Sequence, residues 1–338
     1  MQSTPPVTLR GTENICIHSP LHLGDSVMSI PFLQNLKNRF PKAKITLIAK
    51  TELATLWHGQ PYVDNIRKCT STPKELSKLP QWLRKERFDL SFLLATGKDV
   101  ARAHFKAGIP LRIGYDFWNR GYLLTHLIKT TGYPTDPKLT RKHMVKNYLD
   151  LLERISIQPK FSRPRILKEK KGHNQTMIGI APGASFGPSK RWPAEFYHKL
   201  ILKLSKTFEG KIILLGSSED RHLLKPVFGR LNSKRVINRI GETNLDELMK
   251  WILKCKLVIA NDSGISHLAN ALGVPTITLF GSSSPVWTRP LESRSKVIAL
   301  SLPCSPCFQS VCPLQHTRCL KEISVDKVLS LVTRRLKL

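Results

Sequence analysis

The segment LVIANDSGISHLANALGVPTITLF, residues 257–280, limits the fold of this chain more than any other stretch. Residues 257–260 are an apolar run typical of a buried parallel strand. A helix then starts at the polar residues 261–264 and ends before Gly273. Residues 276–280 are a second apolar run. This strand–helix–strand unit predicts an open α/β sheet, with a helix N-terminus at the carboxyl end of a strand, where backbone N–H groups favour a phosphate.

The same helix carries His267, one turn after Gly264. A neutral imidazole near the helix start is placed to contact a ligand. The segment is also compatible with an ordinary capped helix of any α/β protein, in which His267 is a hydrogen-bonded core residue.

Two domains fit the length of 338 residues. No apolar run approaches the ~20 residues that span a bilayer, and the N-terminal residues lack the apolar region of a secretory signal. We therefore expect a cytoplasmic protein.

The charge balance points to anionic partners. Lys and Arg number 54 against 24 Asp and Glu, a net charge of +30. Such an excess favours phosphorylated substrates, an anionic membrane surface or nucleic acid. The chain lacks a recognisable RNA-recognition, zinc-finger or helix-turn-helix pattern, so nucleic acid is not expected as a partner.

Strands and helices alternate in both halves of the chain, which is typical of doubly wound parallel sheets. The first half has predicted strands at 15–18, 44–48, 65–68 and 89–94 and helices at 26–39, 73–85, 98–107 and 140–155. The second has strands at 177–181, 211–215, 235–238, 257–260 and 276–280 and helices at 193–206, 245–254, 265–272 and 325–336. The charged, proline-containing residues 158–176 are the predicted linker. We expect domains at 1–160 and 175–338 with a ligand cleft between them.

The first strand runs into a Gly-Asp turn. Gly24 permits a tight turn, and Asp25 follows where the next helix begins. Asp25 is either an N-cap, which stabilises a helix by about 1 kcal/mol, or a general base at a strand's carboxyl end.

Two strand ends of the second half carry further candidates. APGASFGPSKRWP, residues 181–193, follows a predicted strand as a Gly/Ser loop, with Lys190 as a mobile cation in front of it. Such a loop suits a phosphate, although it lacks the P-loop pattern, and it is equally an ordinary connection. After residues 211–215, Glu219 or Asp220 is placed either to bond a ribose hydroxyl or adenine amine or to cap the next helix.

Four of the seven cysteines crowd into residues 303–324 with the spacing C-x2-C-x4-C-x6-C. The spacing suits a zinc site or two disulfides, and a reducing cytoplasm favours the metal. A structural cluster without metal is the alternative. The cysteines are Cys304, Cys307, Cys312 and Cys319.

Five motifs occur in the same order as in a known family. They are LGDSVMSIPFLQNLK, PGASFGPSKRWP, NDSGISHLANALGVP, LFGSSSP and the tail CSPCFQSVCPLQHTRCLKEIS. Together they run from residue 15 to about 325. The chain thus resembles the bacterial lipopolysaccharide heptosyltransferases, glycosyltransferase family 9, most closely the subfamily called heptosyltransferase II.

The resemblance implies a GT-B fold, with two Rossmann-like domains, the N-terminal one for the acceptor and the C-terminal one for ADP-heptose. It implies inverting transfer of L-glycero-D-manno-heptose from ADP-heptose to heptosyl-Kdo2-lipid A in the lipopolysaccharide inner core. ADP-heptose is a substrate, and no cofactor or metal is required.

The family's functional residues fall on matching positions of this sequence. The catalytic base falls on Asp25 and the diphosphate-binding lysine on Lys190, and the loop before it places Ser185 and Phe186 against the donor. The segment that holds diphosphate and heptose and two looser adenosine contacts complete the expected donor site: Asp262, Ser263, Gly264 and His267, with Glu219 and Thr243.

The net charge gains a specific interpretation from the resemblance, because the Kdo–lipid A acceptor and the inner leaflet are anionic. We expect a peripheral protein at the inner face of the inner membrane. A basic and aromatic face is predicted to meet acceptor or membrane, unless these are solvated loop charges around core aromatics: Arg112, Arg120, Lys129, Arg141 and Lys142, with Phe117, Trp118 and Tyr122.

Two alternatives remain open. One is a family member with another acceptor, of the heptosyltransferase I or III type. The other is a non-catalytic basic protein that binds nucleotides or polyanions.

Overall fold

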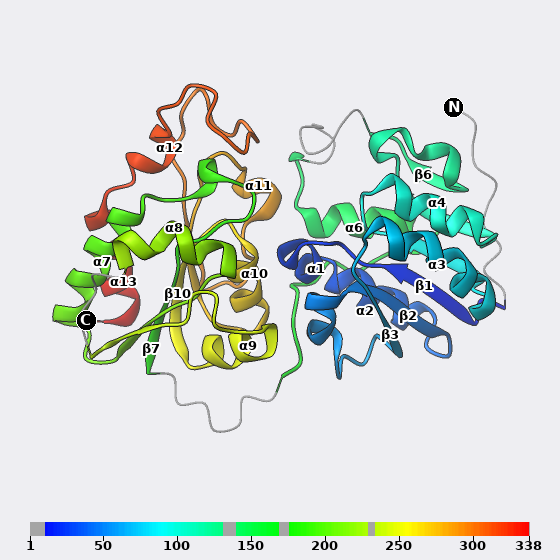
Figure 1. Ribbon diagram of the computed structural model, residues 1–338, viewed down its shortest axis with the longest axis horizontal. Coiled ribbons are helices and arrows are strands. Elements are labelled where there is room, and N and C mark those ends of the chain that lie inside the picture. The colour runs from blue at the N-terminus through cyan, green and yellow to red at the C-terminus, as the bar shows by residue number, and fades with distance from the viewer. Residues whose placement is uncertain (1–10, 131–139, 169–175, 229–233, 338) are drawn as a thin grey trace. The chain divides into compact units, whose positions relative to one another are not determined.

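The computed structural model of the chain describes residues 11–130, 140–168, 176–228 and 234–337. The chain forms two compact units, Met1–Pro164 and Arg165–Leu338. Each is built on its own six-stranded parallel sheet (Figure 1). The boundary between the units falls inside the predicted linker 158–176, part of which, 169–175, lies outside the described residues.

The first unit has the strand order β3-β2-β1-β4-β5-β6. Its strands are β1 (Asn14–His18), β2 (Lys44–Lys50), β3 (Asn65–Cys69), β4 (Leu90–Leu93), β5 (Leu111–Tyr115) and β6 (His126–Ile128). The helices are α1 (Leu23–Met28), α2 (Ile30–Arg39), α3 (Pro73–Glu86), α4 (Lys98–Lys106) and α6 (Met144–Glu153). Short 3-10 turns at Thr51–Trp57, Phe117–Asn119 and Gly121–Leu123 connect them.

The second unit has the order β12-β11-β10-β7-β8-β9. Its strands are β7 (Met177–Ala181), β8 (Lys211–Leu214), β9 (Val236–Asn238), β10 (Cys255–Asn261), β11 (Thr276–Leu279) and β12 (Lys296–Ile298). The helices are α7 (Ala194–Thr207), α8 (Ser218–Phe228), α9 (Leu245–Leu253), α10 (Gly264–Ala271), α11 (Pro285–Thr288), α12 (Arg318–Lys321) and α13 (Val325–Leu336), with a 3-10 turn at Pro188–Lys190.

Both sheets have the same topology. If the strands of the second unit are counted from β7, each order becomes 3-2-1-4-5-6, the order of the Rossmann fold. The order reverses between β1 and β4 in one unit and between β7 and β10 in the other. Ligands bind outside the carboxyl ends of the strands at such switch points. The predicted α/β class with two Rossmann-like units is therefore confirmed.

The central strands form the core of each unit because they are apolar on both faces. Ile15, Ile17 and Leu47 are fully buried in the first sheet, and Ile180 and Ile259 in the second. Helices pack their apolar faces against both sides of such strands. Because both faces of the strands are buried, their sequences are continuous hydrophobic runs.

The structure departs from several predicted bounds. The helix predicted at 26–39 is two helices, α1 and α2, that meet at Ser29, two residues before Pro31. Proline cannot donate a backbone hydrogen bond, so a helix restarts readily at this point. The helix predicted at 140–155 is the shorter α6. Residues 131–139 of the unpatterned stretch 115–141 lie outside the described residues.

The elements that the sequence did not suggest have three to five residues each. They are β5, β6, β12, α11 and α12, whereas α8 begins where a helix was expected after residues 211–215, without predicted bounds. Among the described residues, no helix has both the length and the apolarity needed to cross a bilayer.

Candidate functional site

The switch point of the second sheet brings two sequence motifs together. β7 and β10 are neighbours, with Ala181 paired to Ala260. The loop after β7 carries Lys190, and Asp262 follows the last residue of β10. Although the two residues are 72 positions apart in sequence, Lys190 Nζ lies 2.7 Å from Asp262 Oδ2.

Asp262 is the centre of a buried polar cluster. Its side chain is 3% exposed and that of Lys190 is 16% exposed. Ser283 Oγ donates to Asp262 Oδ2 at 2.5 Å, and Thr288 Oγ1 donates to Oδ1 at 3.1 Å. His267 Nε2 lies 3.6 Å from Oδ1. The carboxylate thus holds the lysine, two hydroxyls and the imidazole in one place.

The electrostatics of this cluster keep the carboxylate charged. Burial raises the pKa of Asp262, but the charge of Lys190 and the contact with His267 outweigh burial. As a result, the pKa of Asp262 lies well below its usual range. An ionised Asp262 repels a phosphate, so it serves to hold the cation Lys190, which retains some access to solvent.

The N-terminus of α10 opens beside this cluster. Ser263 occupies the N-cap position with extended backbone angles, but its side chain makes no capping hydrogen bond. Within the described part of the chain, the buried Ser263 Oγ has no hydrogen-bond partner. A helix start with an unused hydroxyl suits an anion, because the first-turn N–H groups lack partners inside the helix.

Asn261 fixes the two ends of the Lys190 loop. Its Nδ2 donates to the Pro182 carbonyl at 2.7 Å. Its Oδ1 accepts from the Trp192 backbone N–H and from the Tyr197 hydroxyl, both at 3.0 Å. Because Asn261 is fully buried, these bonds hold the loop against the end of β10.

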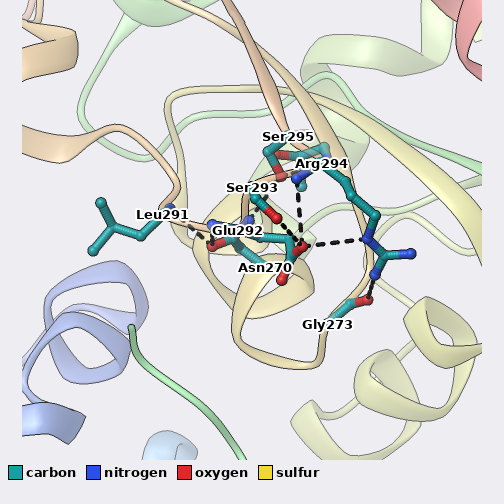
Figure 2. A network of polar contacts seen from close by, with 8 residues as sticks. Asn270, Gly273, Leu291, Glu292, Ser293, Arg294 and Ser295 are labelled. Carbon is teal, nitrogen blue, oxygen red and sulfur yellow. Dashed lines mark hydrogen bonds and ion pairs between the residues drawn. The ribbon is translucent and has the colours of Figure 1, made fainter. Parts of the chain in front are cut away.

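The opposite end of α10 is also anchored (Figure 2). Asn270 Oδ1 accepts from the backbone N–H groups of Leu291 and Glu292, at 3.0 and 2.9 Å. Asn270 Nδ2 donates to Ser295 Oγ at 2.8 Å, and Arg294 donates to the Gly273 carbonyl at 2.9 Å. These contacts fix the helix whose first turn faces the cluster.

The other predicted donor residues lie around the same sheet edge. Phe186 is partly exposed, with Lys190 Nζ 4.9 Å from the centre of its ring, and Ser185 is exposed. Glu219 is exposed in the first turn of α8, after β8, and Thr243 is half-buried between β9 and α9. β8 and β9 are the next strands after β7, so these residues follow the carboxyl ends of consecutive strands.

Asp220, the alternative to Glu219, is buried in the structure. Its Oδ2 accepts from the backbone N–H and the hydroxyl of Ser217, both at 2.9 Å. A Cβ at Gly183 would lie 2.1 Å from this oxygen. The carboxylate of Asp220 therefore occupies space beside the loop that only a glycine at 183 leaves free.

Asp25 lies in the first unit, in the first turn of α1 after the end of β1. The N-cap of α1 is His22, so the prediction that Asp25 is an N-cap is wrong. The cause is that the helix begins three residues earlier than the sequence indicated. Asp25 is half-buried and follows β1, one of the two strands between which the strand order of the sheet reverses.

A buried basic group lies at the same end of the first sheet, and no sequence pattern predicted its burial. Arg120 is fully buried and donates to the carbonyls of Ala95, at 2.6 Å, and Tyr115, at 2.9 Å.

Two buried histidines lie near Arg120. His18 Nδ1 lies 3.2 Å from His104 Nε2. Burial and the charge of Arg120 lower the pKa of His18 to about 3, and the pKa of His104 also falls well below its usual value. Both imidazoles are therefore neutral.

The predicted basic and aromatic face needs correction at two positions. Arg120 and Phe117 are buried, so neither lies on a surface. Trp118 and Tyr122 are 64% and 66% exposed, and Lys98 Nζ lies 5.2 Å from the ring centre of Tyr122. Of the other basic residues, Arg112 is half-buried, Lys142 pairs with Asp150, and Lys129 and Arg141 are exposed.

Ser283 and Thr288 are site residues that sequence reasoning missed. Ser283 belongs to the motif LFGSSSP, for which no ligand contact was predicted. Ser283 and Thr288 follow β11, the strand next to β10 in the sheet, and this position was the sequence signal that could have placed them in the site.

The four clustered cysteines are free thiols. Within the described ranges no three His, Cys, Asp or Glu side chains form a ready metal-ligand set.

Comparison with known proteins extends over almost the whole chain. The profile of "Glycosyltransferase family 9 (heptosyltransferase)" matches residues 76–318. Lipooligosaccharide heptosyltransferase 2 of Campylobacter jejuni is 31% identical over 334 residues, covering 96% of this chain and 98% of that protein. Lipopolysaccharide heptosyltransferase 2 of Escherichia coli K12 is 30% identical over 308 residues, covering 85% and 88%.

A solved structure agrees with these relatives. The structure of E. coli ADP-heptose lipopolysaccharide heptosyltransferase II matches with a TM-score of 0.81 and 28% identity, covering 96% of this chain and 98% of that one. The family profile, the relatives and the fold lead to one conclusion: the chain belongs to glycosyltransferase family 9, the heptosyltransferases, and is a glycosyltransferase.

Proposed function

We propose that this enzyme transfers L-glycero-D-manno-heptose from ADP-heptose to heptosyl-Kdo2-lipid A, in the assembly of the lipopolysaccharide inner core. The observation that carries the proposal is the Lys190–Asp262 pair at the β7–β10 switch point, beside the N-terminus of α10. Relatives that are about 30% identical and named heptosyltransferase 2 support the choice of substrates.

The donor binds to the second unit in this proposal. Lys190 meets the diphosphate, and its ammonium neutralises the charge that develops as ADP departs. Ser263 and Gly264 offer the hydroxyl and the helix N-terminus to the same phosphates. His267 Nε2 is near Oδ1 of Asp262, whereas Lys190 contacts Oδ2, and His267 is assigned to the heptose.

The rest of the donor meets exposed groups along the sheet edge. Phe186, partly exposed, and Ser185 border the sugar nucleotide. Glu219 and Thr243, after β8 and β9, are assigned to adenosine. No metal or cofactor takes part in this proposal, because Lys190 and α10 supply the positive charge that the leaving group needs.

Asp25 acts as general base in a single displacement. Its carboxylate accepts the proton of the acceptor hydroxyl, and the hydroxyl oxygen forms the new bond to the anomeric carbon. The bond from that carbon to the diphosphate breaks, and the electron pair leaves with ADP. Because the nucleophile enters opposite the leaving group, the anomeric configuration inverts.

The acceptor and the membrane give the basic charge a role. Kdo carboxylates, lipid A phosphates and the inner leaflet are all anionic, and the chain carries a net charge of +30. We assign the first unit to the acceptor and place the enzyme at the cytoplasmic face of the inner membrane as a peripheral protein. The exposed Trp118, Tyr122 and Arg141 are the residues assigned to that surface.

The proposal is tested by ADP release from ADP-heptose, with and without heptosyl-Kdo2-lipid A, and by the mass of the product. Acceptor-dependent release with one added heptose is expected. Release with Kdo2-lipid A instead would show a heptosyltransferase I type of enzyme. Failure to bind ADP-heptose would refute the donor assignment and favour a polyanion-binding protein.

The role of Asp25 has its own control. Asp25→Asn should reduce kcat by at least about 100-fold, the lower range for loss of a general base, while ADP-heptose affinity remains. Glu13, an exposed carboxylate before β1, provides the control, and Glu13→Gln should retain activity.

A further inference from the structure

Three segments of the second unit meet at Ser189, the residue directly before Lys190. The first is the loop after β7, which contains both residues, and the second is the loop after β11. The third is an irregular segment, residues 299–317, between β12 and α12, drawn in orange near α12 in Figure 1. An irregular segment of this length inside a compact domain usually has a functional role, and the contacts of Ser189 indicate what that role is.

Ser189 is buried, and each of its polar groups is bonded to one of the other two segments. The residue is 2% exposed. Its N–H donates to the Ser310 carbonyl at 3.1 Å, and its carbonyl accepts from the Ser282 N–H at 3.3 Å. Its hydroxyl donates to the Gln309 carbonyl and lies 2.8 Å from the Ser282 hydroxyl. Ser189 thus connects the Lys190 loop to both neighbours.

The hydrogen bonds of the two hydroxyls have a defined direction. A serine hydroxyl has one proton to donate, and a carbonyl only accepts. The proton of Ser189 is therefore used on Gln309, and Ser282 donates to Ser189. Ser282 is 1% exposed, and its own carbonyl accepts from the Phe308 N–H at 2.7 Å. Removal of the Ser189 hydroxyl would leave both Ser282 and Gln309 without their partner.

The backbones of the three segments also approach one another closely. A Cβ at Gly281 would lie 2.6 Å from the Ser189 carbonyl oxygen, and a Cβ at Gly187 would lie 2.4 Å from the Ser310 carbonyl oxygen. The Ser305 hydroxyl donates to the Gly281 carbonyl at 2.7 Å. The segments are therefore in direct contact on both sides of Ser189, so its hydrogen bonds join loops that are already packed together.

Ser189 and Ser282 each directly precede a residue that contacts Asp262. Lys190 Nζ lies 2.7 Å from Asp262 Oδ2, and Ser283 Oγ donates to the same oxygen at 2.5 Å. We propose that the Ser189–Ser282 hydroxyl pair positions Lys190 for the donor diphosphate, by fastening the lysine loop to the loop that carries Ser283. The two serines are positioning residues, because they act through Lys190. This inference rests on the donor site of the proposed function.

A lysine depends on such support more than a shorter side chain does. Its ammonium lies at the end of a flexible four-carbon stem, so its position varies with that of the backbone that carries it. Ordering the ammonium in advance reduces the entropy that is lost when the diphosphate binds. Loss of the Ser189 hydroxyl should therefore weaken the binding of ADP, whereas adenosine, which lacks the diphosphate, should bind as before.

The test compares Ser189→Ala with Ser205→Ala in the full-length protein, with ADP and adenosine titrated separately and followed by NMR. The Ser205 hydroxyl donates to the Ile201 carbonyl of its own helix at 2.8 Å, so Ser205→Ala is the matched control and should leave both affinities unchanged. We expect Ser189→Ala to weaken ADP binding by about 2-fold to 30-fold and adenosine binding by less than about 2-fold. Ser282→Ala should have a smaller effect, because the bond from Ser189 to Gln309 remains.

Two results of these titrations would overturn the positioning role. One is an unchanged ADP affinity in Ser189→Ala. The other is an equal loss of ADP and adenosine affinity, which would indicate a general disturbance of the unit. If Ser189→Ala does not fold, Ser282→Ala provides the same comparison.

A second measurement distinguishes failure of this inference from failure of the proposed function. The decrease in Tm caused by Ser189→Ala is measured with Lys190 present and in the Lys190→Met background. It should be smaller by about 2 °C or more in that background, because the pair that Ser189 supports is gone. Additive decreases would contradict the proposal. A wild type that binds no ADP refutes the proposed donor, and the Tm comparison still decides whether Ser189 holds Lys190.

Discussion

The Lys190–Asp262 pair allows a quantitative prediction that separates its structural role from its role in binding. Two unit charges 2.7 Å apart attract by about 6 kcal/mol at an effective dielectric constant of 20. Desolvation opposes much of this attraction, but breaking a buried pair from one side leaves an uncompensated charge and costs about 3–5 kcal/mol. Since Lys190 retains some solvent and Asp262 keeps two hydroxyl donors, we expect about 3 kcal/mol for Lys190→Met.

That loss predicts a measurable change in thermal stability. A domain of 150–250 residues loses about 2–4 °C in Tm per kcal/mol, so the transition of the second unit should fall by about 6–12 °C. Asp262→Asn should cost less, about 1–2 kcal/mol, because the unpaired ammonium can turn toward water. The double variant removes both charges and should recover most of the stability.

The measurement is a double-mutant cycle, with denaturation and ADP titration on the same four proteins. A coupling free energy of about 2 kcal/mol or more is expected, and neither Lys190→Met nor the double variant should bind ADP well. Lys203→Met is the control, because Lys203 forms an exposed pair with Asp326 of the kind that contributes about 0–1 kcal/mol. A coupling no larger than that of the exposed pair would refute the buried-pair reasoning.

Three further predictions follow from the buried groups. His18 has a pKa of about 3 in the folded state against about 6.5 unfolded, so its contribution to stability is present above pH 6.5 and is lost as the pH falls toward 3. Between pH 7 and 5, the part of the stability loss that comes from His18 should be about 2 kcal/mol, measured by chemical denaturation at both pH values. His18→Gln should show less of this loss than the exposed-site control His58→Gln, and equal slopes would contradict it. Arg120→Met should lower the unfolding free energy by about 3 kcal/mol or more, because it leaves the carbonyls of Ala95 and Tyr115 without their hydrogen-bond donor. As a control, Arg141→Met at an exposed position should change the unfolding free energy by less than about 0.5 kcal/mol. Gly183→Ala should weaken ADP binding and lower Tm, because the new Cβ clashes with Asp220. Gly97→Ala is the control and should do neither, since its Cβ meets nothing closer than 3.6 Å. Normal ADP binding by Gly183→Ala would show that the loop adapts.

Sequence patterns predicted much of this fold because it is built from repeated strand–helix units. The buried strands β1, β7 and β10 are continuous apolar runs, and polar residues mark where each one stops. From the sequence, Lys190 and Asp262 could be placed only at the carboxyl ends of two strands, and their direct contact could not be predicted. It depends on β7 and β10 being neighbours, and no local pattern fixes the order of strands in a sheet.

Arg120 shows the limit of such reasoning. In sequence it lies among aromatic and basic residues and suggests an exposed face. In the structure the carbonyls of Ala95 and Tyr115 accept its hydrogen bonds, and the negative charge of Asp116 partly offsets the cost of burial. Those acceptors come from separate segments, β5 and the loop after β4, and become available only once the sheet has formed. Local sequence therefore cannot distinguish this arginine from Arg141.

The repeated topology has a consequence for how the chemistry is divided. Asp25 follows the first strand of one unit, and Lys190 follows the first strand of the other, each at the point where strand order reverses. In the mechanism proposed above, the base and the leaving-group cation act on opposite faces of the sugar, and the two residues assigned to these roles come from different units. On these proposed roles, the two variants should fail at different steps: Asp25→Asn should bind ADP like the wild type and fail in transfer, whereas Lys190→Met should fail already in binding. If Asp25→Asn also lost ADP affinity, the donor site would depend on both units and this division would be wrong.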